Sequence, residues 1–144
     1  MKQRKRVKIE RKLYPDGDGI ESIPIRRAGV YQVLNTVTGA GYIGSAVDVR
    51  VRCQTHRSQL HQGDHHNRRV QRDAKIYGPG AFRFKVVEFV EELRELESKE
   101  AQWIRWLQSQ GPGASYNLEI GVKMLPESRY LIAERVLLEH RNFC

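Results

Sequence analysis

Residues 29–46, which read GVYQVLNTVTGAGYIGSA, decide the fold of this chain. Two runs rich in β-branched and aromatic residues flank the segment Val37–Ala40, and this pattern predicts a β-hairpin. In a hairpin with a two-residue turn, the numbers of paired positions sum to an odd value, and side chains alternate between the faces of the sheet. We therefore expect Tyr31 and Tyr42 to point from the same sheet face.

A helix is predicted to follow the hairpin. Asp48 is a suitable N-cap for a segment that extends to Gln62. Arg52 and His56 are four positions apart in that segment, so they lie on one face of the helix. A guanidinium, an imidazole and the two phenols of the hairpin can thus converge over one patch.

Such a patch suits the hydrolysis of a phosphodiester. Attack by water builds negative charge on the phosphoryl oxygens, and the planar guanidinium of Arg52 can meet that charge with two parallel hydrogen bonds. The attacking water must also lose a proton, which a phenol beside a cation or a neutral imidazole can accept or relay. Tyr31, Tyr42 and His56 all qualify for that task.

The long helical pattern that starts at Leu93 carries an acid within its apolar stripe. Leu93, Leu96, Ile104 and Leu107 follow offsets of three and four, and Glu100 stands where the stripe requires a core residue. A buried carboxylate is costly unless it is paired, protonated or bound to a cation. Because Mg²⁺ needs only one or two carboxylates beside water and phosphate oxygens, Glu100 is the predicted metal ligand.

Taken together, these motifs resemble the GIY-YIG nuclease superfamily from residue 29 to about residue 117. Gly29-Val30-Tyr31 resembles the first motif with Val in place of Ile, and Tyr42-Ile43-Gly44 matches the second. The arginine ten residues after the second tyrosine and the acid three residues before an aromatic-Ile pair also fit the family spacing. The resemblance assigns catalytic positions to Tyr31, Tyr42, Arg52, His56, Glu100 and Asn117, with His65 as a possible accessory residue.

The resemblance also implies a fold and a reaction. The fold is of the α/β (α+β) class, with a small central three-stranded antiparallel sheet flanked by helices. The reaction is cleavage of DNA by a metal-dependent endonuclease that uses one Mg²⁺ or Mn²⁺ per active site, needs no small-molecule cofactor and leaves 5′-phosphate and 3′-hydroxyl ends. We favour Tyr31 as the general base, with Tyr42 orienting water and phosphate. Asn117 has an alternative role as a structural residue that bonds a loop backbone.

The formal net charge of +8 is unevenly distributed. Residues 1–12 carry seven Lys and Arg against one Glu, so most of the excess lies in this segment, whereas residues 88–100 carry six acids. A polarised surface of this kind predicts binding to a polyanion that weakens with salt. The candidate DNA-binding residues are Lys5, Arg6, Lys8, Arg50, Arg57, Arg68, Arg69 and Arg72.

Three parts of the chain are expected. Residues 1–28 form a basic N-terminal arm or hairpin, residues 29–122 the nuclease domain, and residues 123–144 a C-terminal helix packed on the domain or on a second subunit of a homodimer. Two cysteines and the lack of an eighteen-residue apolar run predict a cytoplasmic protein without a membrane partner, and the family resemblance implies one that is prokaryotic or phage-encoded.

The histidines between the two motif helices invite a competing hypothesis. Cys53, His56, His61 and His65 can be combined on paper into a zinc site, but their spacing fits no common zinc template. We expect His61, His65 and His66 to lie in a solvated loop with some phosphate contact.

Alternatives to the general endonuclease hypothesis remain. One is a restriction-type, sequence-specific endonuclease of the same family, in which the arm and C-terminal helix give specificity and dimerisation. Another is a DNA-binding or repair module that does not cut, and a third is an RNase. A homing endonuclease is disfavoured, since these enzymes usually append a long linker and a separate DNA-binding domain.

Overall fold

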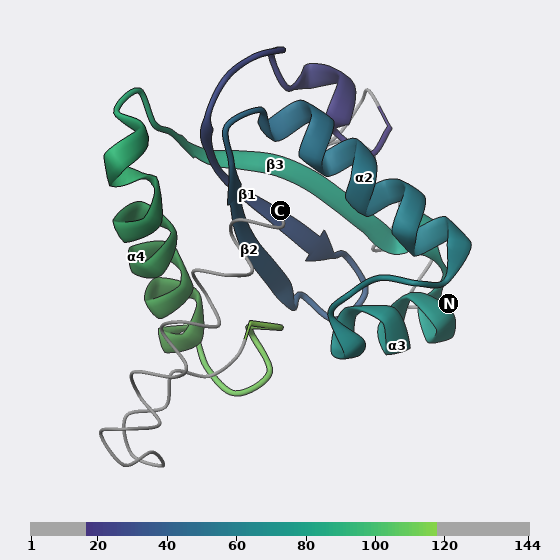
Figure 1. The fold of residues 1–144 in the computed structure, drawn as a ribbon. Helices are drawn as coiled ribbons and strands as arrows, with labels where there is room; N and C mark the ends of the chain where they lie inside the picture. Colours follow the sequence, from purple (N-terminus) through teal and green to yellow (C-terminus); the bar gives the residue numbers. More distant parts are fainter. Residues whose placement is uncertain (1–16, 118–144) are drawn as a thin grey trace.

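The computed structural model describes residues 17–117, and its centre is one antiparallel sheet (Figure 1). The strands are Gly29–Asn35 (β1), Gly41–Ala46 (β2) and Phe82–Phe89 (β3), in the order β2-β1-β3. The helices are Val49–Gln62 (α2), Arg68–Tyr77 (α3) and Leu96–Ser109 (α4), and the 3₁₀ turns are Ile20–Ser22 (η1), Pro79–Ala81 (η2) and Leu93–Glu95 (η3). The expected three-stranded antiparallel sheet with flanking helices is confirmed.

The register of the hairpin places both motif tyrosines on one face. Tyr31 pairs with Gly44, and Val33 pairs with Tyr42. Each pair of numbers sums to an odd value, so the parity expected from the sequence is confirmed, although five residues rather than two connect the strands.

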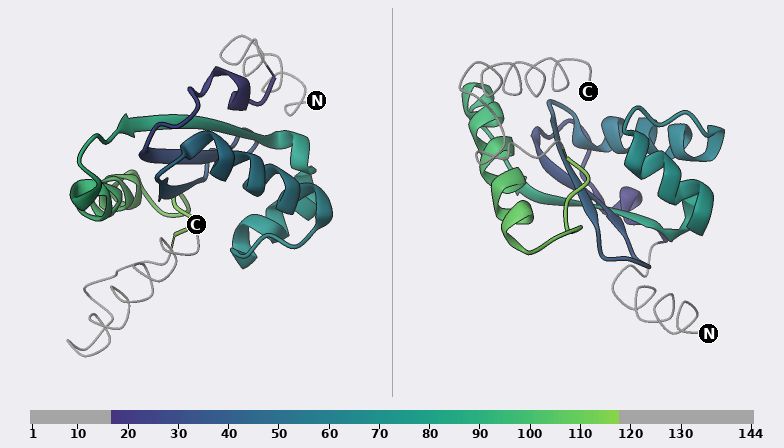
Figure 2. Two further views of the ribbon diagram at one scale, coloured as in Figure 1. Left: turned by 45° about the horizontal axis from the view of Figure 1, so that its top comes forward. Right: turned by 90° about the horizontal axis from the view of Figure 1, so that it is seen from below.

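Helices cover both faces of the sheet, as Figure 2 shows. Helices α2 and α3 cover the face that carries the tyrosines, where the core contains Tyr31, Val33, Tyr42, Val49, Cys53, Leu60, Val70 and Phe84. Helix α4 covers the other face, where the core contains Val30, Ile43, Val90, Leu96, Ile104 and Leu107. The alternation of side chains along β1 and β2 supplies both layers.

Side-chain caps define how α2 and α3 begin. The Asp48 carboxylate accepts a hydrogen bond from the Val51 N–H at 3.2 Å, and the Asn67 side chain accepts from the N–H groups of Arg69 and Val70, each at 3.1 Å. Helix α2 ends at Gly63, whose φ of 80° reverses the chain direction. The short connection that follows folds residues 64–67 back toward the sheet.

Residues 17–28 contain the 3₁₀ turn η1 and no strand. The Asp18 carboxylate accepts from the Ile20 N–H at 3.1 Å, and the Phe84 N–H of β3 donates to the Asp18 carbonyl at 2.8 Å. Ile20 and Ile23 are buried in the core under α2, so the packed domain begins before Gly29. The basic residues 1–12 and the C-terminal segment 123–144 lie outside the described residues.

The apolar stripe of α4 begins later than the sequence pattern predicts. Leu93 is 56% exposed because it belongs to the turn η3, and the buried stripe starts at Leu96. Among residues 17–117, no helix has the length and apolar character needed to cross a membrane.

Candidate active site

Tyr31 and His56 form the centre of the site. The Tyr31 Oη lies 2.6 Å from the His56 Nε2, and both side chains are fully buried. A Cβ added at Gly44 would lie 2.4 Å from the Tyr31 Oη, a distance that real Cβ contacts do not show. The glycine of the second motif therefore provides the space that the phenol occupies.

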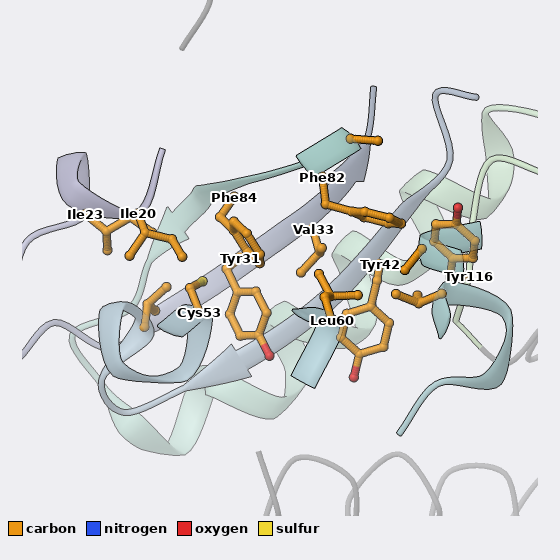
Figure 3. Close-up of a cluster of buried hydrophobic side chains, with 14 of the residues drawn as sticks. Ile20, Ile23, Tyr31, Val33, Tyr42, Cys53, Leu60, Phe82, Phe84 and Tyr116 are labelled. Carbon is orange, nitrogen blue, oxygen red and sulfur yellow. The ribbon is translucent and has the colours of Figure 1, made fainter. Parts of the chain in front are cut away.

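Tyr42 lies beside this pair on the same sheet face. Figure 3 shows both phenol rings with their hydroxyl groups on one side of the core cluster. The Tyr42 Oη is 3.3 Å from the His66 Nε2, and its ring centroid is 5.5 Å from that of His56. Two tyrosine–histidine pairs thus stand next to each other.

The histidines form a cluster, and the expectation of a solvated loop is wrong for His65, which is only 5% exposed. Its ring stacks against those of His56 and His66, and its Nε2 lies 2.7 Å from the His56 Nδ1. The reversal after Gly63 folds the connection under the sheet face, which buries His65. His61, which precedes the reversal, stays exposed at the end of α2.

Burial and neighbouring charge keep these imidazoles neutral. Burial first, then the charges of His65, Arg52 and His66, lower the pKa of His56 well below its usual value. Burial and the His66 charge lower the pKa of His65 to about 3, and burial and the Arg52 charge lower that of His66 to about 4. The positive charge of Arg52 contributes to all three shifts.

Nitrogen donors of His56, His65 and His66 lie within 4.8 Å of one another, which suggests a transition-metal site. Tetrahedral zinc with Zn–N bonds of about 2.0–2.1 Å separates its nitrogen ligands by about 3.3 Å. The 2.7 Å between His56 and His65 is a hydrogen-bond distance instead. Cys53 packs in the apolar core, so the zinc set considered from the sequence does not assemble.

Glu100 is the carboxylate best suited to a hard cation. It is 3% exposed, and among residues 17–117 only Asp73 is another buried acid. Asp73 already accepts a hydrogen bond from the Tyr116 hydroxyl at 2.6 Å and contacts Arg72 at 3.3 Å. Helix α4, which carries Glu100, packs on β2, the edge strand that carries Tyr42. An oxygen donor of this kind fits Mg²⁺ or Mn²⁺.

Asn117 supports the edge of the sheet. Its side-chain oxygen accepts from the Ile43 N–H at 2.8 Å, and its side-chain nitrogen donates to the Ile43 carbonyl at 2.8 Å. Gly41 makes two further backbone hydrogen bonds, to Ala114 and Tyr116. Since both ends of the Asn117 amide bind the backbone between Tyr42 and Gly44, the side chain positions β2.

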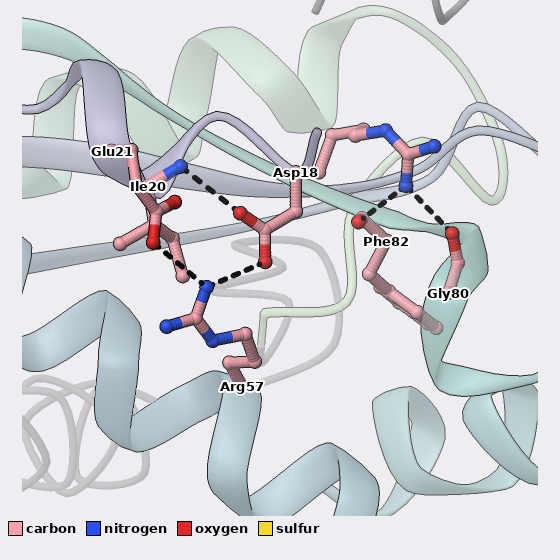
Figure 4. Close-up of polar contacts among 7 residues, drawn as sticks. Asp18, Ile20, Glu21, Arg57, Gly80 and Phe82 are labelled. Carbon is pink, nitrogen blue, oxygen red and sulfur yellow. Dashed lines mark hydrogen bonds and ion pairs between the residues drawn. The ribbon is translucent and has the colours of Figure 1, made fainter. Parts of the chain in front are cut away.

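The candidate DNA-binding arginines differ in their surroundings. Arg57 is paired with Asp18 at 3.2 Å and Glu21 at 3.4 Å (Figure 4), so two carboxylates already offset its charge. Arg50 is half-buried, with an Nη1 that donates to the Ile23 carbonyl at 3.5 Å. Arg68, Arg69 and Arg72 are exposed on α3. Lys5, Arg6 and Lys8 lie outside the described residues.

Sequence reasoning missed three residues that contact the site. His66 meets Tyr42, Gln71 accepts a hydrogen bond from the His65 backbone N–H at 2.7 Å, and the Asn67 N–H donates to the His65 Nδ1 at 3.1 Å. The available signal was the helix start at Asn67, which marks a tight turn directly after the histidines.

Comparison with known proteins agrees with this geometry. The family model described as the GIY-YIG catalytic domain matches residues 27–117. Over 93 residues the chain is 31% identical to Intron-associated endonuclease 1 of Enterobacteria phage T4. The aligned region covers 64% of this chain and only 37% of the phage protein. This chain therefore spans well under half the length of that relative.

Two solved structures share the fold. The catalytic domain of the homing endonuclease I-TevI superposes with a TM-score of 0.55 and 29% identity, covering 62% of this chain and 97% of that domain. A point variant of the same catalytic domain gives a TM-score of 0.53 and 29% identity, covering 58% and 87%. The chain described here belongs to the GIY-YIG catalytic domain family.

Proposed function

We propose that this protein is a divalent-metal-dependent DNA endonuclease that leaves 5′-phosphate and 3′-hydroxyl ends. The observation that carries the proposal is the buried pair of Tyr31 and His56, with Tyr42 beside it on the same sheet face. Membership of a family of catalytic domains and the likeness to an intron endonuclease support it.

In the proposed reaction Tyr31 acts as the general base. As a phenolate it takes a proton from water while the water oxygen attacks phosphorus, the bond from phosphorus to the 3′ oxygen breaks, and the leaving oxygen gains a proton from solvent. Tyr42 orients the water and the phosphate. The Arg52 guanidinium, which stays charged throughout, stabilises the negative charge that develops on the phosphoryl oxygens.

Glu100 would hold Mg²⁺ or Mn²⁺. When bound, such an ion polarises the phosphate and offsets its charge. Glu100 is buried on α4, the helix that packs on the strand carrying Tyr42, and this position supports the assignment.

DNA is the proposed substrate, and the exposed arginines of α3 are the proposed phosphate contacts within the described part of the chain. The relative encoded by phage T4 is an intron-associated endonuclease, which favours cutting over a DNA-binding module that does not cut. A restriction-type enzyme and an RNase remain outcomes of the test below.

The test compares plasmid DNA, branched DNA and RNA of matched length, each incubated with Mg²⁺, Mn²⁺ or a chelator. We expect metal-dependent nicking of DNA and loss of about a hundredfold or more in rate for Tyr31→Phe, Arg52→Ala and Glu100→Gln. Discrete plasmid bands would favour the restriction-type reading, and faster cutting of RNA would favour an RNase.

Matched controls use the same substitutions at exposed or peripheral positions. Tyr77→Phe, Arg105→Ala and Glu91→Gln repeat the three chemical changes away from the site and should keep the activity of the parent protein. Cleavage that persists at the parent rate in both Arg52→Ala and Glu100→Gln would refute the proposed site.

A further inference from the structure

Four groups form one continuous chain of hydrogen bonds that ends on the Tyr31 oxygen. The Asn67 backbone N–H lies 3.1 Å from the His65 Nδ1, the His65 Nε2 lies 2.7 Å from the His56 Nδ1, and the His56 Nε2 lies 2.6 Å from the Tyr31 Oη. The chain runs from the connection between α2 and α3, through α2, to β1. Both histidines and the tyrosine are buried.

The first group in this chain fixes the direction of every later bond. A backbone N–H can only donate, so the His65 Nδ1 must accept. A neutral imidazole has one N–H, which in His65 must then be on Nε2, and it donates to the His56 Nδ1. By the same reasoning the His56 proton is on Nε2 and donates to the Tyr31 Oη.

Both rings are neutral in this arrangement. His56 is fully buried and His65 is nearly so, and the pKa of each is lowered by that burial. A charged His65 would also set its Nδ1–H against the Asn67 N–H at 3.1 Å. One tautomer of each ring is therefore the arrangement that satisfies all three contacts.

The connection that supplies the first N–H is held in place from several sides. The Asn67 side chain caps α3 through Arg69 and Val70 and donates to the Tyr116 carbonyl at 2.9 Å. The Gln71 side chain accepts from the His65 backbone N–H at 2.7 Å. Asn67 and His65 thus keep one orientation relative to each other.

We propose that Asn67 and Gln71 are positioning residues that fix the tautomers of His65 and His56, so that His56 donates a hydrogen bond to the Tyr31 oxygen and is not itself the base. This inference rests on the proposed function, in which Tyr31 takes the proton of water. A donated N–H favours the phenolate form of Tyr31 over the phenol. His56 keeps its own proton during the step, and the proton from water stays on the Tyr31 Oη until solvent removes it.

The histidines do not carry that proton onward, because the chain ends at a backbone N–H that cannot accept one. The other titratable or charged groups beside this chain of hydrogen bonds are Tyr42 of β2, Arg52 of α2 and His66 of the connection before α3. Arg52 also favours the phenolate, since it is a cation beside the same cluster.

The direct test is nuclear magnetic resonance of the full chain with ¹⁵N-labelled histidine, because long-range ¹H–¹⁵N correlations report which ring nitrogen carries the proton. We expect His56 and His65 both to be protonated on Nε2 at neutral pH. His61→Gln, His66→Gln and His140→Gln variants assign the remaining signals. A proton on the His56 Nδ1 would overturn the inference, whatever the cleavage activity of the protein.

A second test separates positioning from structural support. Gln71→Leu removes the acceptor for the His65 backbone N–H. We expect Tyr31 to reach its basic form only at higher pH in this variant. At neutral pH, kcat should then fall by about tenfold for each unit by which the pKa of Tyr31 rises. The rate should recover at high pH, KM should stay constant, and Gln71→Glu should restore the profile. An equal loss at every pH would overturn the positioning role.

Exposed Gln54 on α2 provides the matched control, since Gln54→Leu makes the same chemical change outside the chain of hydrogen bonds. The two proposals also fail differently. If both tautomers are as expected but Tyr31→Phe cuts at the parent rate, Tyr31 is not the base and the hydrogen-bond order stands. If the tautomers are reversed, the order is refuted even where Tyr31→Phe is inactive.

Discussion

Replacing Gly44 with alanine tests the packing on which the site depends. The new Cβ would lie 2.4 Å from the Tyr31 Oη and 2.5 Å from its Cζ, whereas ordinary contact begins at 3.4 Å. The phenol must therefore retreat by about 1 Å. Its ring is rigid and fully buried, so it cannot turn into solvent.

The magnitude follows from two losses. Overpacking a buried position costs about 1–3 kcal/mol. A shift of this size also breaks the 2.6 Å hydrogen bond to His56, which contributes about 1 kcal/mol. We expect Gly44→Ala to lower the free energy of unfolding by about 2–4 kcal/mol. A misplacement of about 1 Å at the proposed base should slow cleavage about a hundredfold.

Urea unfolding and plasmid nicking measure the two effects separately, with nicking assayed at a temperature where circular dichroism shows the variant folded. Gly80→Ala is the matched control because an added Cβ at Gly80 meets nothing within 4 Å. If Gly44→Ala and Gly80→Ala had the same free energy of unfolding and the same nicking rate, the reasoning from the close approach of Tyr31 to β2 would be refuted.

Buried polar groups give three more expectations. Lowering the pH from about 7 to about 5 should destabilise the fold, because His65 stays neutral in the folded protein, with a pKa of about 3, while the unfolded chain binds a proton below about pH 6.5. The contribution of neutral His65 to the free energy of unfolding is thus fully present above about pH 6.5 and is lost as the pH falls. His65→Gln should reduce the acid-induced loss of unfolding free energy, measured with urea, by up to about 2 kcal/mol. An unchanged loss would contradict this. In a variant whose C-terminal cysteine is replaced by serine, Cys53 should react with a thiol reagent only as fast as the protein unfolds, because burial raises the pKa of its thiol. Rapid labelling of the native state would contradict the burial of Cys53. Tyr116→Phe should lower the free energy of unfolding by about 1–3 kcal/mol, as it leaves Asp73 without its 2.6 Å hydrogen bond, and an equal effect of Tyr77→Phe would argue otherwise.

Local patterns in the sequence were sufficient for much of the sheet and its adjoining helices. Strand parity placed Tyr31 and Tyr42 on one face, and the Asp48 cap marked the start of α2. The apolar spacing around Glu100 predicted its burial in α4. These features depend on contacts between residues close in sequence, which periodicity and capping rules describe.

Features that depend on tertiary packing were not predictable in this way. His65 is buried because the chain reverses at Gly63 and brings its ring against His56 of α2, whereas its polar neighbours in the sequence suggested a solvated loop. Leu93 fits the helical spacing but falls in a 3₁₀ turn, where it is exposed.

The segment of residues 114–117 links two properties that seem separate. It occupies the outer edge of β2 and also supplies the Tyr116 carbonyl that holds Asn67. A chain that stopped before residue 114 would leave an unpaired strand open to association with other molecules. The same truncation would release the turn that orders the histidines, so aggregation and loss of the imidazole arrangement should appear together.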